Sequence, residues 1–163
     1  MIKIIYVAGG CFWGVEAYFK QLKGVLDTKV GYANGIKDEI SYQELKEGKD
    51  IHAETVCIEY NDQLISLEKI LEHFLRFVDP YSVNKQGHDV GIQYRSGIYY
   101  VDQNDYPIIK KYFDDNIYGQ YQIEILPLKN FCLAEDYHQD YLDKNPGGYC
   151  HVNLSLIKER EKK

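Results

Sequence analysis

Cys11 combines a reactive side chain with a position that could activate it. It follows an apolar run at residues 2–8 and two glycines, and it precedes apolar side chains at helical spacing. A cysteine at the start of a helix faces unpaired backbone N–H groups and the positive end of the helix dipole, which favour the thiolate. Ionising half of the thiol near pH 7 requires about 2 kcal/mol, which is the most that a helix end provides. We therefore expect a nucleophilic sulfur that needs a further donor or activation by its substrate, although a cysteine at such a turn can also simply fill the core.

The remaining cysteines are too few and too widely spaced to indicate a disulfide scaffold or a zinc site. Cys57, Cys132 and Cys150 form no Cys-x-x-Cys pattern with one another or with Cys11. Cys57 falls within a predicted strand and Cys132 between two apolar residues, so packing is the simpler role for both. The sequence has neither metal-ligand spacing nor a glycine-rich phosphate or dinucleotide fingerprint. We expect reactive thiols, no metal and no bound cofactor.

The elements that must position Cys11 read as strands and helices mixed along one domain spanning residues 1–163. Strands are predicted at residues 2–8, 25–32, 54–60, 96–101 and 123–126, and helices at 11–23, 41–47, 66–78, 107–118 and 135–142. Their order favours the α+β class, as a ferredoxin-like α/β plait in which helices pack on a mixed sheet. Residues 81–95 lack periodicity but carry many polar side chains, so we expect an ordered loop.

The C-terminal part of the chain is expected to be irregular. Residues 145–163 begin with Asn-Pro-Gly-Gly and show no clear periodicity, which predicts a mobile tail. The last six residues, Lys-Glu-Arg-Glu-Lys-Lys, have little apolar surface to bury and are expected to fray.

Charge and hydropathy exclude several classes of partner. The net charge is −6, and acidic and basic residues are interleaved without a Lys/Arg stripe. Nucleic acids and anionic membrane surfaces are therefore poor candidates. The apolar run near the start is too short for a signal-peptide core or a spanning helix, so we expect a cytoplasmic protein.

Several short segments, in order along the chain, carry a family resemblance. The run Gly10-Cys11-Phe12-Trp13-Gly14 resembles the active-site signature of the peptide methionine sulfoxide reductase A family. The resemblance continues with the Tyr-x-Glu segment at Tyr42, with His52-Ala53-Glu54, with Gly-x-Asp-x-Gly-x-Gln-Tyr-Arg-Ser at 87–96, with 134–139 and with Asn-Pro-Gly-Gly-Tyr-Cys at 145–150. One such match could be accidental, but a series in the same order from residue 9 to residue 150 is not.

The resemblance implies reduction of methionine-S-sulfoxide, free or in proteins, to methionine. A sulfoxide is a poor electrophile until its oxygen is protonated, so attack by Cys11 on the sulfur needs an acid, and the family's candidate is Glu54. An ionised Glu54 would raise the pKa of the thiol, so the carboxyl must be protonated while the thiol is ionised, or the two must share one proton. Tyr42 and Tyr94 would donate to the sulfoxide oxygen, with Tyr149 as a further donor.

The same resemblance suggests how the substrate is bound and how the enzyme is recycled. Phe12 and Trp13 would contact the S-methyl group, and Asp89 would orient the tyrosines or a water molecule. Cys11 would become a sulfenic acid, which Cys150 would convert to a disulfide, with Cys132 as the fallback. A dithiol reductant such as thioredoxin would then reduce this disulfide.

Two other functions fit some of the same residues. One is a Cys/His/Asp acyl hydrolase built from Cys11, His52 or His138, and Asp89, which would turn over esters or amides without a reductant. The other is a module that recognises oxidised methionine without reducing it, and replacement of Cys11 by Ser would leave that function intact.

Overall fold

A six-stranded sheet forms the centre of the molecule. The computed structural model describes residues 1–163, and the strands lie in the order β7-β6-β1-β3-β2-β8. Their bounds are β1 Ile2–Gly9, β2 Val25–Ala33, β3 Ala53–Asn61, β6 Ser96–Tyr100, β7 Glu124–Pro127 and β8 Phe131–Leu133. All neighbouring strands are antiparallel except β6 and β7, which are parallel. The α+β class expected from the sequence is confirmed.

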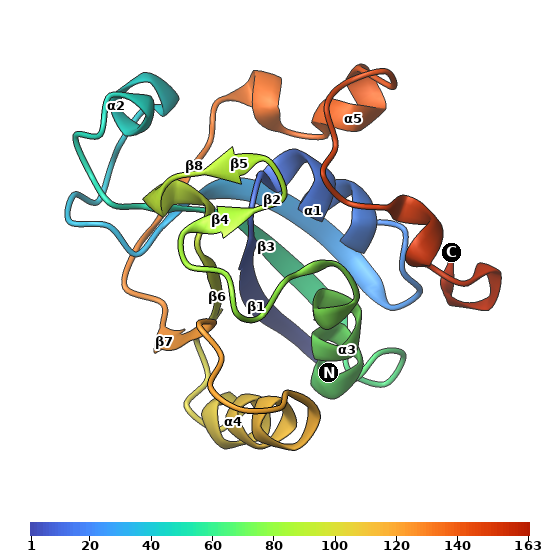
Figure 1. The fold of residues 1–163 in the computed structure, drawn as a ribbon. Coiled ribbons are helices and arrows are strands. Elements are labelled where there is room, and N and C mark those ends of the chain that lie inside the picture. Colours follow the sequence, from blue (N-terminus) through green and yellow to red (C-terminus); the bar gives the residue numbers. More distant parts are fainter.

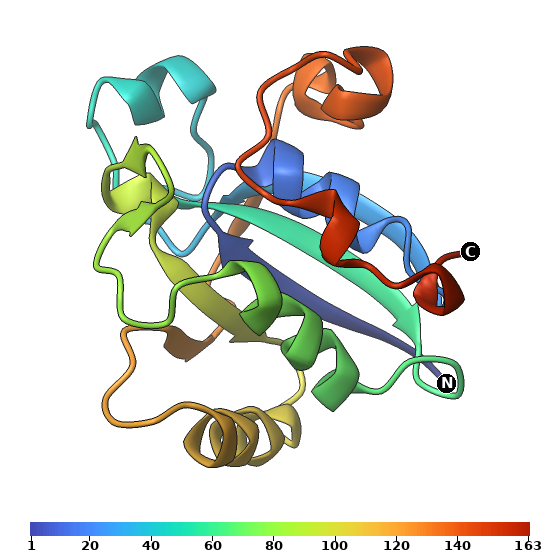
Figure 2. The ribbon, with the colours of Figure 1, turned by 45° about the vertical axis from the view of Figure 1, so that its right-hand side comes forward.

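Two helices cover one face of this sheet. Helix α1 (Phe12–Phe19) follows β1, and α3 (Leu67–Phe77) follows β3. Figures 1 and 2 show both helices on the same side of the strands, with α4 (Asp105–Asn116) beside α3 at the β7 end. The sequence led us to expect a ferredoxin-like plait. The chain runs in the order β1, α1, β2, β3, α3, β6, and these four strands lie side by side as β6-β1-β3-β2.

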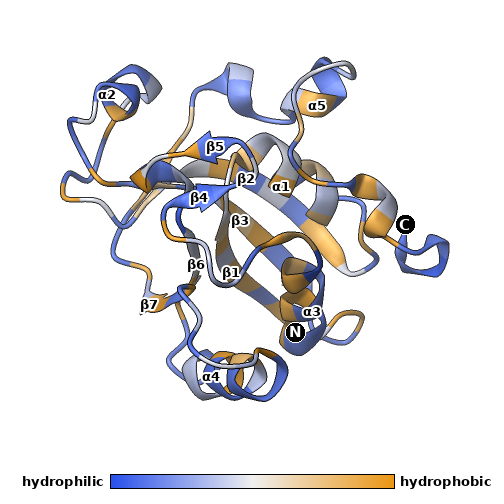
Figure 3. Ribbon diagram, viewed as in Figure 1, coloured by the Kyte–Doolittle hydropathy of each residue, from blue (hydrophilic) through white to orange (hydrophobic).

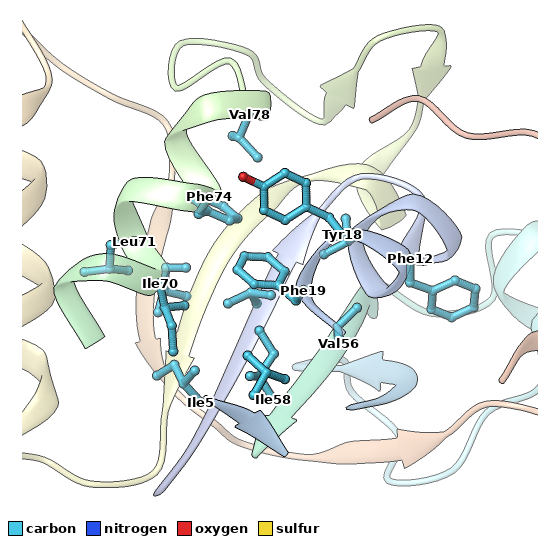
Figure 4. Packing of buried hydrophobic residues seen from close by; sticks show 14 of the residues in the cluster. Ile5, Phe12, Tyr18, Phe19, Val56, Ile58, Ile70, Leu71, Phe74 and Val78 are labelled. Atoms are coloured by element: carbon cyan, nitrogen blue, oxygen red, sulfur yellow. The ribbon is translucent and has the colours of Figure 1, made fainter. Parts of the chain in front are cut away.

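The main hydrophobic core lies between these helices and the sheet. Alternate residues of β3, Val56, Ile58 and Tyr60, are fully buried, as the period-2 pattern predicted. Figure 4 shows Phe19 of α1 and Phe74 of α3 packed over the strand residues. The opposite face of β1 is more exposed, so the sheet is covered completely on only one side.

Helix α3 has the start and stop that the sequence predicted. The Ser66 hydroxyl accepts a hydrogen bond from the backbone N–H of Lys69 at 3.1 Å, which satisfies one free N–H of the first turn. Ile70, Leu71 and Phe74 form the buried stripe, and the chain becomes extended at Val78. Figure 3 shows hydrophobic and hydrophilic residues alternating around this helix.

Some boundaries differ from the sequence-based expectations. Helix α1 ends at Phe19 rather than near residue 23, and β8 was not predicted because three residues give no measurable periodicity. The helix expected at 135–142 is split into a 3₁₀ turn, Asp136–His138, and α5, Tyr141–Lys144, because Asp140 adopts a φ of 52°.

The remaining short elements are α2 (Tyr42–Lys46) and a hairpin of β4 (Lys85–Gln86) with β5 (Asp89–Val90). The hairpin and the 3₁₀ helix Ile92–Tyr94 lie within residues 81–95, which were expected to form an ordered loop. No helix is long and apolar enough to cross a bilayer.

The expectation that the end of the chain has little to pack against was wrong. Val152 and Ile157 are buried in the main core, and the backbone N–H of Lys163 donates to the Gln21 carbonyl at 2.9 Å. Glu161 accepts two hydrogen bonds of 2.8 Å from the Arg76 guanidinium of α3. These contacts join residues far apart in sequence, so local composition did not reveal them.

Candidate active site

A cavity of about 300 Å³ opens at the junction of β1 and α1. Its lining comprises Cys11, Phe12, Trp13, Tyr42, Glu54, Asp89, Tyr94 and Tyr149. These are all the site residues expected from the sequence except Cys150, and they come from five separate segments of the chain. A larger hollow of about 770 Å³ lies between residues 38–44 and β8, and Cys132 is the only cysteine that lines it.

The turn between β1 and α1 places Cys11 at the wall of this cavity. Gly10 adopts a φ of 94°, and a Cβ atom there would lie 2.8 Å from the Gln86 Cβ and 2.9 Å from the His151 Nε2. Only glycine fits such a turn without displacing its neighbours. Cys11 follows as the residue that precedes the first turn of α1.

The electrostatics of Cys11 favour the neutral thiol before substrate binds. Burial raises the pKa of Cys11 well above its usual range, and the neighbouring Glu54 carboxyl raises it further. A backbone N–H bond from Trp13 to the sulfur acts in the opposite direction but is outweighed. The helix start therefore does not produce a resting thiolate, which leaves activation by the substrate as the remaining route of the two expected from the sequence.

Glu54 lies on β3 with its carboxyl almost entirely shielded from water. Its Oε1 accepts a hydrogen bond from the Phe12 backbone N–H at 3.3 Å, and its Oε2 accepts one from Gln93 Nε2 at 3.4 Å. Both bonds are long, so they only partly offset the loss of hydration. Burial raises the pKa of Glu54 to about 8, so most of this carboxyl is protonated at pH 7.

Two phenols reach the cavity from different segments. Tyr42 is the first residue of α2, and Tyr94 ends the 3₁₀ helix that follows β5. Burial raises the pKa of Tyr42 to about 12 and raises that of Tyr94 as well, so both hydroxyls keep their protons at neutral pH. Neither hydroxyl donates within the protein, so both can donate to a bound oxygen.

Tyr149 differs from the other two phenols because its proton is already engaged. Its hydroxyl donates to Asp89 Oδ2 at 3.0 Å, and burial followed by this bond raises its pKa to about 12. Asp89 therefore fixes the orientation of Tyr149, whose remaining capacity is as an acceptor.

Aromatic side chains form the apolar part of the wall. Phe12 is buried against Tyr32, with ring centroids 5.8 Å apart. Trp13 is half-buried and stacks on Tyr141 at a centroid distance of 3.7 Å. The indole Nε1–H of Trp13 donates to His138 Nδ1 at 3.0 Å. Phe12 thus serves the core as well as the cavity.

Sequence reasoning missed two supports of this wall, Tyr141 and Glu135. Glu135 accepts hydrogen bonds from the Tyr32 hydroxyl at 2.8 Å and from the Tyr42 backbone N–H at 3.1 Å, so it ties β2 to the start of α2. The sequence held no signal for these two residues. It did hold one for His138, because a half-buried indole N–H such as that of Trp13 needs an acceptor.

The histidines do not assemble a hydrolase triad with Cys11. His52 is fully buried beneath Gly35 and does not line the cavity. The Nδ1 of His138 is already occupied by the Trp13 indole. Neither histidine lines the cavity that holds Cys11, so an acyl hydrolase is not favoured.

The other cysteines lie at different distances from the helix start. A Cβ atom on Gly14 would be 3.0 Å from Cys150 Sγ. Gly14 follows Cys11 by three residues, so Gly14 and Cys11 face the same side at the start of α1. Cys132 Sγ instead donates to the Ile40 carbonyl at 3.4 Å. Cys57, expected to be a buried strand residue, is only half-buried, on the sheet face away from α1.

Known proteins resemble this chain in sequence and in fold. The family model described as "Peptide methionine sulfoxide reductase" matches residues 3–163. A protein named peptide methionine sulfoxide reductase MsrA from Ureaplasma urealyticum is 52% identical over 163 residues, which cover 98% of this chain and 99% of the relative. A second protein of that name, from Clostridium acetobutylicum, is 51% identical over 162 residues, which cover 98% of this chain and 99% of that relative.

Among solved structures, this chain is similar to Mxr1 from Saccharomyces cerevisiae in its reduced form. The two folds superpose with a TM-score of 0.86 at 36% sequence identity, covering 94% of this chain and 92% of the yeast chain. Together with the family model, these matches show that the chain belongs to the peptide methionine sulfoxide reductase family.

Proposed function

We propose that this chain reduces the S epimer of methionine sulfoxide, free or in proteins, to methionine, with Cys11 as the nucleophile. The observation that carries the proposal is the cavity itself, which brings the Cys11 thiol together with a protonated, buried Glu54 carboxyl and the free hydroxyls of Tyr42 and Tyr94. A sulfoxide needs a nucleophile for its sulfur and hydrogen-bond donors for its oxygen, and one cavity supplies both.

The first step transfers the sulfoxide oxygen to Cys11. Glu54 donates its proton to that oxygen as the Cys11 sulfur attacks, and the proton of the thiol replaces the one lost from Glu54. The sulfur–oxygen bond of the substrate breaks, methionine leaves, and Cys11 holds a sulfenic acid. The substrate sulfur gains two electrons and Cys11 loses two, so this step needs no other reactant.

The apolar wall supports a choice between the two epimers. Phe12 and Trp13 offer carbon contacts for the S-methyl group on one side of the cavity, while Tyr42 and Tyr94 offer donors for the oxygen on the other. A sulfoxide sulfur has three different substituents and a lone pair, so the wrong epimer would place its oxygen against carbon. Asp89 and Tyr149 would lie beside these donors, but the Tyr149 hydroxyl already donates to Asp89 and so would not donate to the oxygen as the sequence suggested.

Cys150 is the thiol that we assign to the second step. It would attack the sulfenic acid of Cys11 to give a disulfide and water, and its sulfur already lies against the first turn of α1. Residues 145–163 would form the C-terminal tail of a single catalytic domain. Because Val152 and Ile157 are buried in the main core, its movement would be confined to residues 145–150, where Gly147 has no close neighbours.

A thioredoxin-like dithiol would return the disulfide to two thiols. Mxr1 has a structure in complex with Trx2, which superposes on this chain with a TM-score of 0.57 at 26% identity. We infer the same class of reductant here, acting without a bound cofactor, and a cytoplasmic location, where thiols are kept reduced.

The test is a turnover assay with separated epimers of a methionine sulfoxide peptide. With dithiothreitol present, the S epimer should be reduced and the R epimer should not, and Cys11→Ser should abolish the reaction. With no reductant added, Cys150→Ser should release one methionine per enzyme and keep its sulfenic acid, whereas Cys132→Ser should release one methionine and form the disulfide. Reduction by Cys11→Ser, or ester hydrolysis without a thiol, would contradict the assignment.

A further inference from the structure

His151, the residue after Cys150, makes one partly buried hydrogen bond to the strand that leads to Cys11. Its Nε2 lies 2.8 Å from the backbone carbonyl oxygen of Gly9, at the end of β1. A carbonyl oxygen can only accept, so Nε2 must carry the proton and donate it. The other ring nitrogen, Nδ1, is buried and has no partner. The polar role of this side chain is therefore confined to the bond with Gly9.

This bond joins the two segments that carry the reacting thiols. Gly9 precedes Cys11 by two residues, and His151 follows Cys150 by one, although the bonded residues are 142 positions apart in sequence. Burial lowers the pKa of His151, and the bond to Gly9 opposes that effect only in part, so the ring is neutral at physiological pH. A neutral ring with its proton on Nε2 keeps the bond intact.

Two glycines make room for the tail at this point. A Cβ atom on Gly10 would lie 2.9 Å from His151 Nε2. A Cβ atom on Gly14 would lie 3.0 Å from Cys150 Sγ and 3.4 Å from His151 Nδ1. The surface of the β1–α1 turn is thus free of side chains where Cys150 and His151 approach it.

One other side-chain contact beside Cys150 joins this part of the tail to the domain: the Tyr149 hydroxyl donates to Asp89 Oδ2 at 3.0 Å. The Cys150 thiol bonds only to the Val152 carbonyl, at 3.2 Å, which is within the tail itself. A Cβ atom on Gly147 would have no neighbour within 4 Å. Toward the C-terminus, the next polar contact with the rest of the domain is the bond from Arg76 to the Leu156 carbonyl at 3.0 Å. Val152 adds an apolar contact on Gly14, but an apolar contact does not fix the orientation of the tail.

We propose that His151 is a positioning residue for disulfide formation, because its bond to the Gly9 carbonyl holds Cys150 against the first turn of α1 beside Cys11. The inference rests on the proposed role of Cys150. In the step concerned, the sulfur–oxygen bond of the Cys11 sulfenic acid breaks and the Cys11–Cys150 bond forms. The hydroxyl leaves with the proton of the Cys150 thiol as water, and His151 is neither oxidised nor reduced.

A pair of amide substitutions separates this role from simple packing. The side-chain nitrogen of Gln can occupy the place of His Nε2 and donate to Gly9, whereas the shorter Asn reaches only the place of Nδ1. Reduced enzyme would be mixed with a methionine-S-sulfoxide peptide, quenched over time, and analysed by mass spectrometry for methionine, for dimedone-trapped sulfenic acid and for the disulfide.

His151→Asn should release the first methionine at the wild-type rate but form the disulfide about tenfold more slowly, the effect of one lost hydrogen bond. His151→Gln should restore the wild-type rate of disulfide formation. The exposed tail residue Ser155, changed to Ala, is the control and should alter neither step.

Three results would overturn the inference: wild-type disulfide formation in His151→Asn, a Gln variant as slow as the Asn variant, or slower methionine release in the Asn variant. Cys150→Ser, run in parallel, separates this failure from that of the proposed function. If Cys150→Ser accumulates sulfenic acid, Cys150 is the resolving thiol whatever the histidine variants do. If it still forms an intramolecular disulfide, the assignment of Cys150 itself is wrong.

Discussion

The carboxyl of Glu54 lies 3.3 Å from the backbone nitrogen of Phe12, the residue next to Cys11. The turn that presents the sulfur therefore also holds the carboxyl, so the two groups keep a fixed relation although Cys11 precedes α1 and Glu54 is on β3. Neither carries a charge at neutral pH, because burial raises both pKa values. A sulfoxide that enters this site therefore meets a protonated thiol on Cys11 and a protonated carboxyl on Glu54.

Glu54→Gln should slow the first step strongly while the fold survives. The amide has the size of the carboxyl but cannot supply a proton, and loss of general acid catalysis costs about 10²- to 10⁴-fold. Single-turnover release of methionine measures this step without the disulfide chemistry. Gln93→Ala, which removes only the 3.4 Å bond to Oε2, is the comparison and should have a much smaller effect. A Gln variant within threefold of wild type would exclude Glu54 as the acid.

The rate of the first step should fall as the pH rises through about 8. Burial raises the pKa of Glu54 to about 8, so the proton donor is lost above that value. The sign is that of an acid whose protonated form is active, so the rate is highest below the pKa. A single-turnover pH profile from 6 to 9.5 should show this decline in the wild-type protein and none in Glu54→Gln. A rate that instead rises with pH throughout would indicate that thiol ionisation alone limits the step.

Stability should also fall between about pH 4.5 and 8. Glu16 and Glu54 have pKa values raised by burial to about 7 and about 8, whereas an unfolded glutamate titrates near 4.5. In this window the folded state keeps protons that the unfolded state has released, so the free energy of unfolding decreases as pH rises, by a few kcal/mol in total.

Urea unfolding at pH 5 and pH 8 measures the difference, and Glu16→Gln should reduce it. In the wild-type protein the Glu16 carboxylate accepts bonds from Thr28 Oγ1 at 2.9 Å and from the Asp140 N–H at 2.8 Å, which oppose but do not cancel the effect of burial. Equal stability of the wild-type protein at the two pH values would contradict the raised pKa values.

Trp13→Ala should weaken substrate binding more than it slows chemistry. The indole forms the apolar wall and is held by Tyr141 and His138, so its removal costs contact area for the S-methyl group. We expect KM to rise about tenfold, with a smaller change in kcat. Trp13→Phe keeps an aromatic ring but loses the bond to His138, so its KM should lie between those of the wild-type protein and Trp13→Ala. An unchanged KM in Trp13→Ala would remove Trp13 from the binding surface.

The ion pair between Arg76 and Glu161 should be a measurable anchor of the C-terminus. Two hydrogen bonds of 2.8 Å join these side chains, which are 16% and 9% exposed. Arg76→Ala would leave a largely buried carboxylate with Lys69, 3.2 Å away, as its remaining ion-pair partner, and we expect a loss of about 2 kcal/mol in the free energy of unfolding. Lys111→Ala, which breaks a pair that is 78% and 56% exposed, is the control and should cost less than about 0.5 kcal/mol. Equal effects of the two substitutions would show that the tail contributes little.

The sequence by itself determined the kinds of residue in the site and most of the elements that carry them. Apolar alternation in β3 and the capped stripe of α3 depend on neighbours within a few residues, so their periods could be read directly. The motif around Cys11, with its matching segments, indicated which side chains to expect in one cavity.

Only the tertiary structure decided how these groups are charged and what holds them. The pKa values of Cys11 and Glu54 depend on how completely other segments exclude water, and no local pattern reports that quantity. The bonds from Trp13 to His138 and from His151 to Gly9 join residues more than a hundred positions apart. Such contacts arise from the packing of whole elements, which is why the helix start alone suggested a thiolate while the folded chain surrounds a neutral thiol.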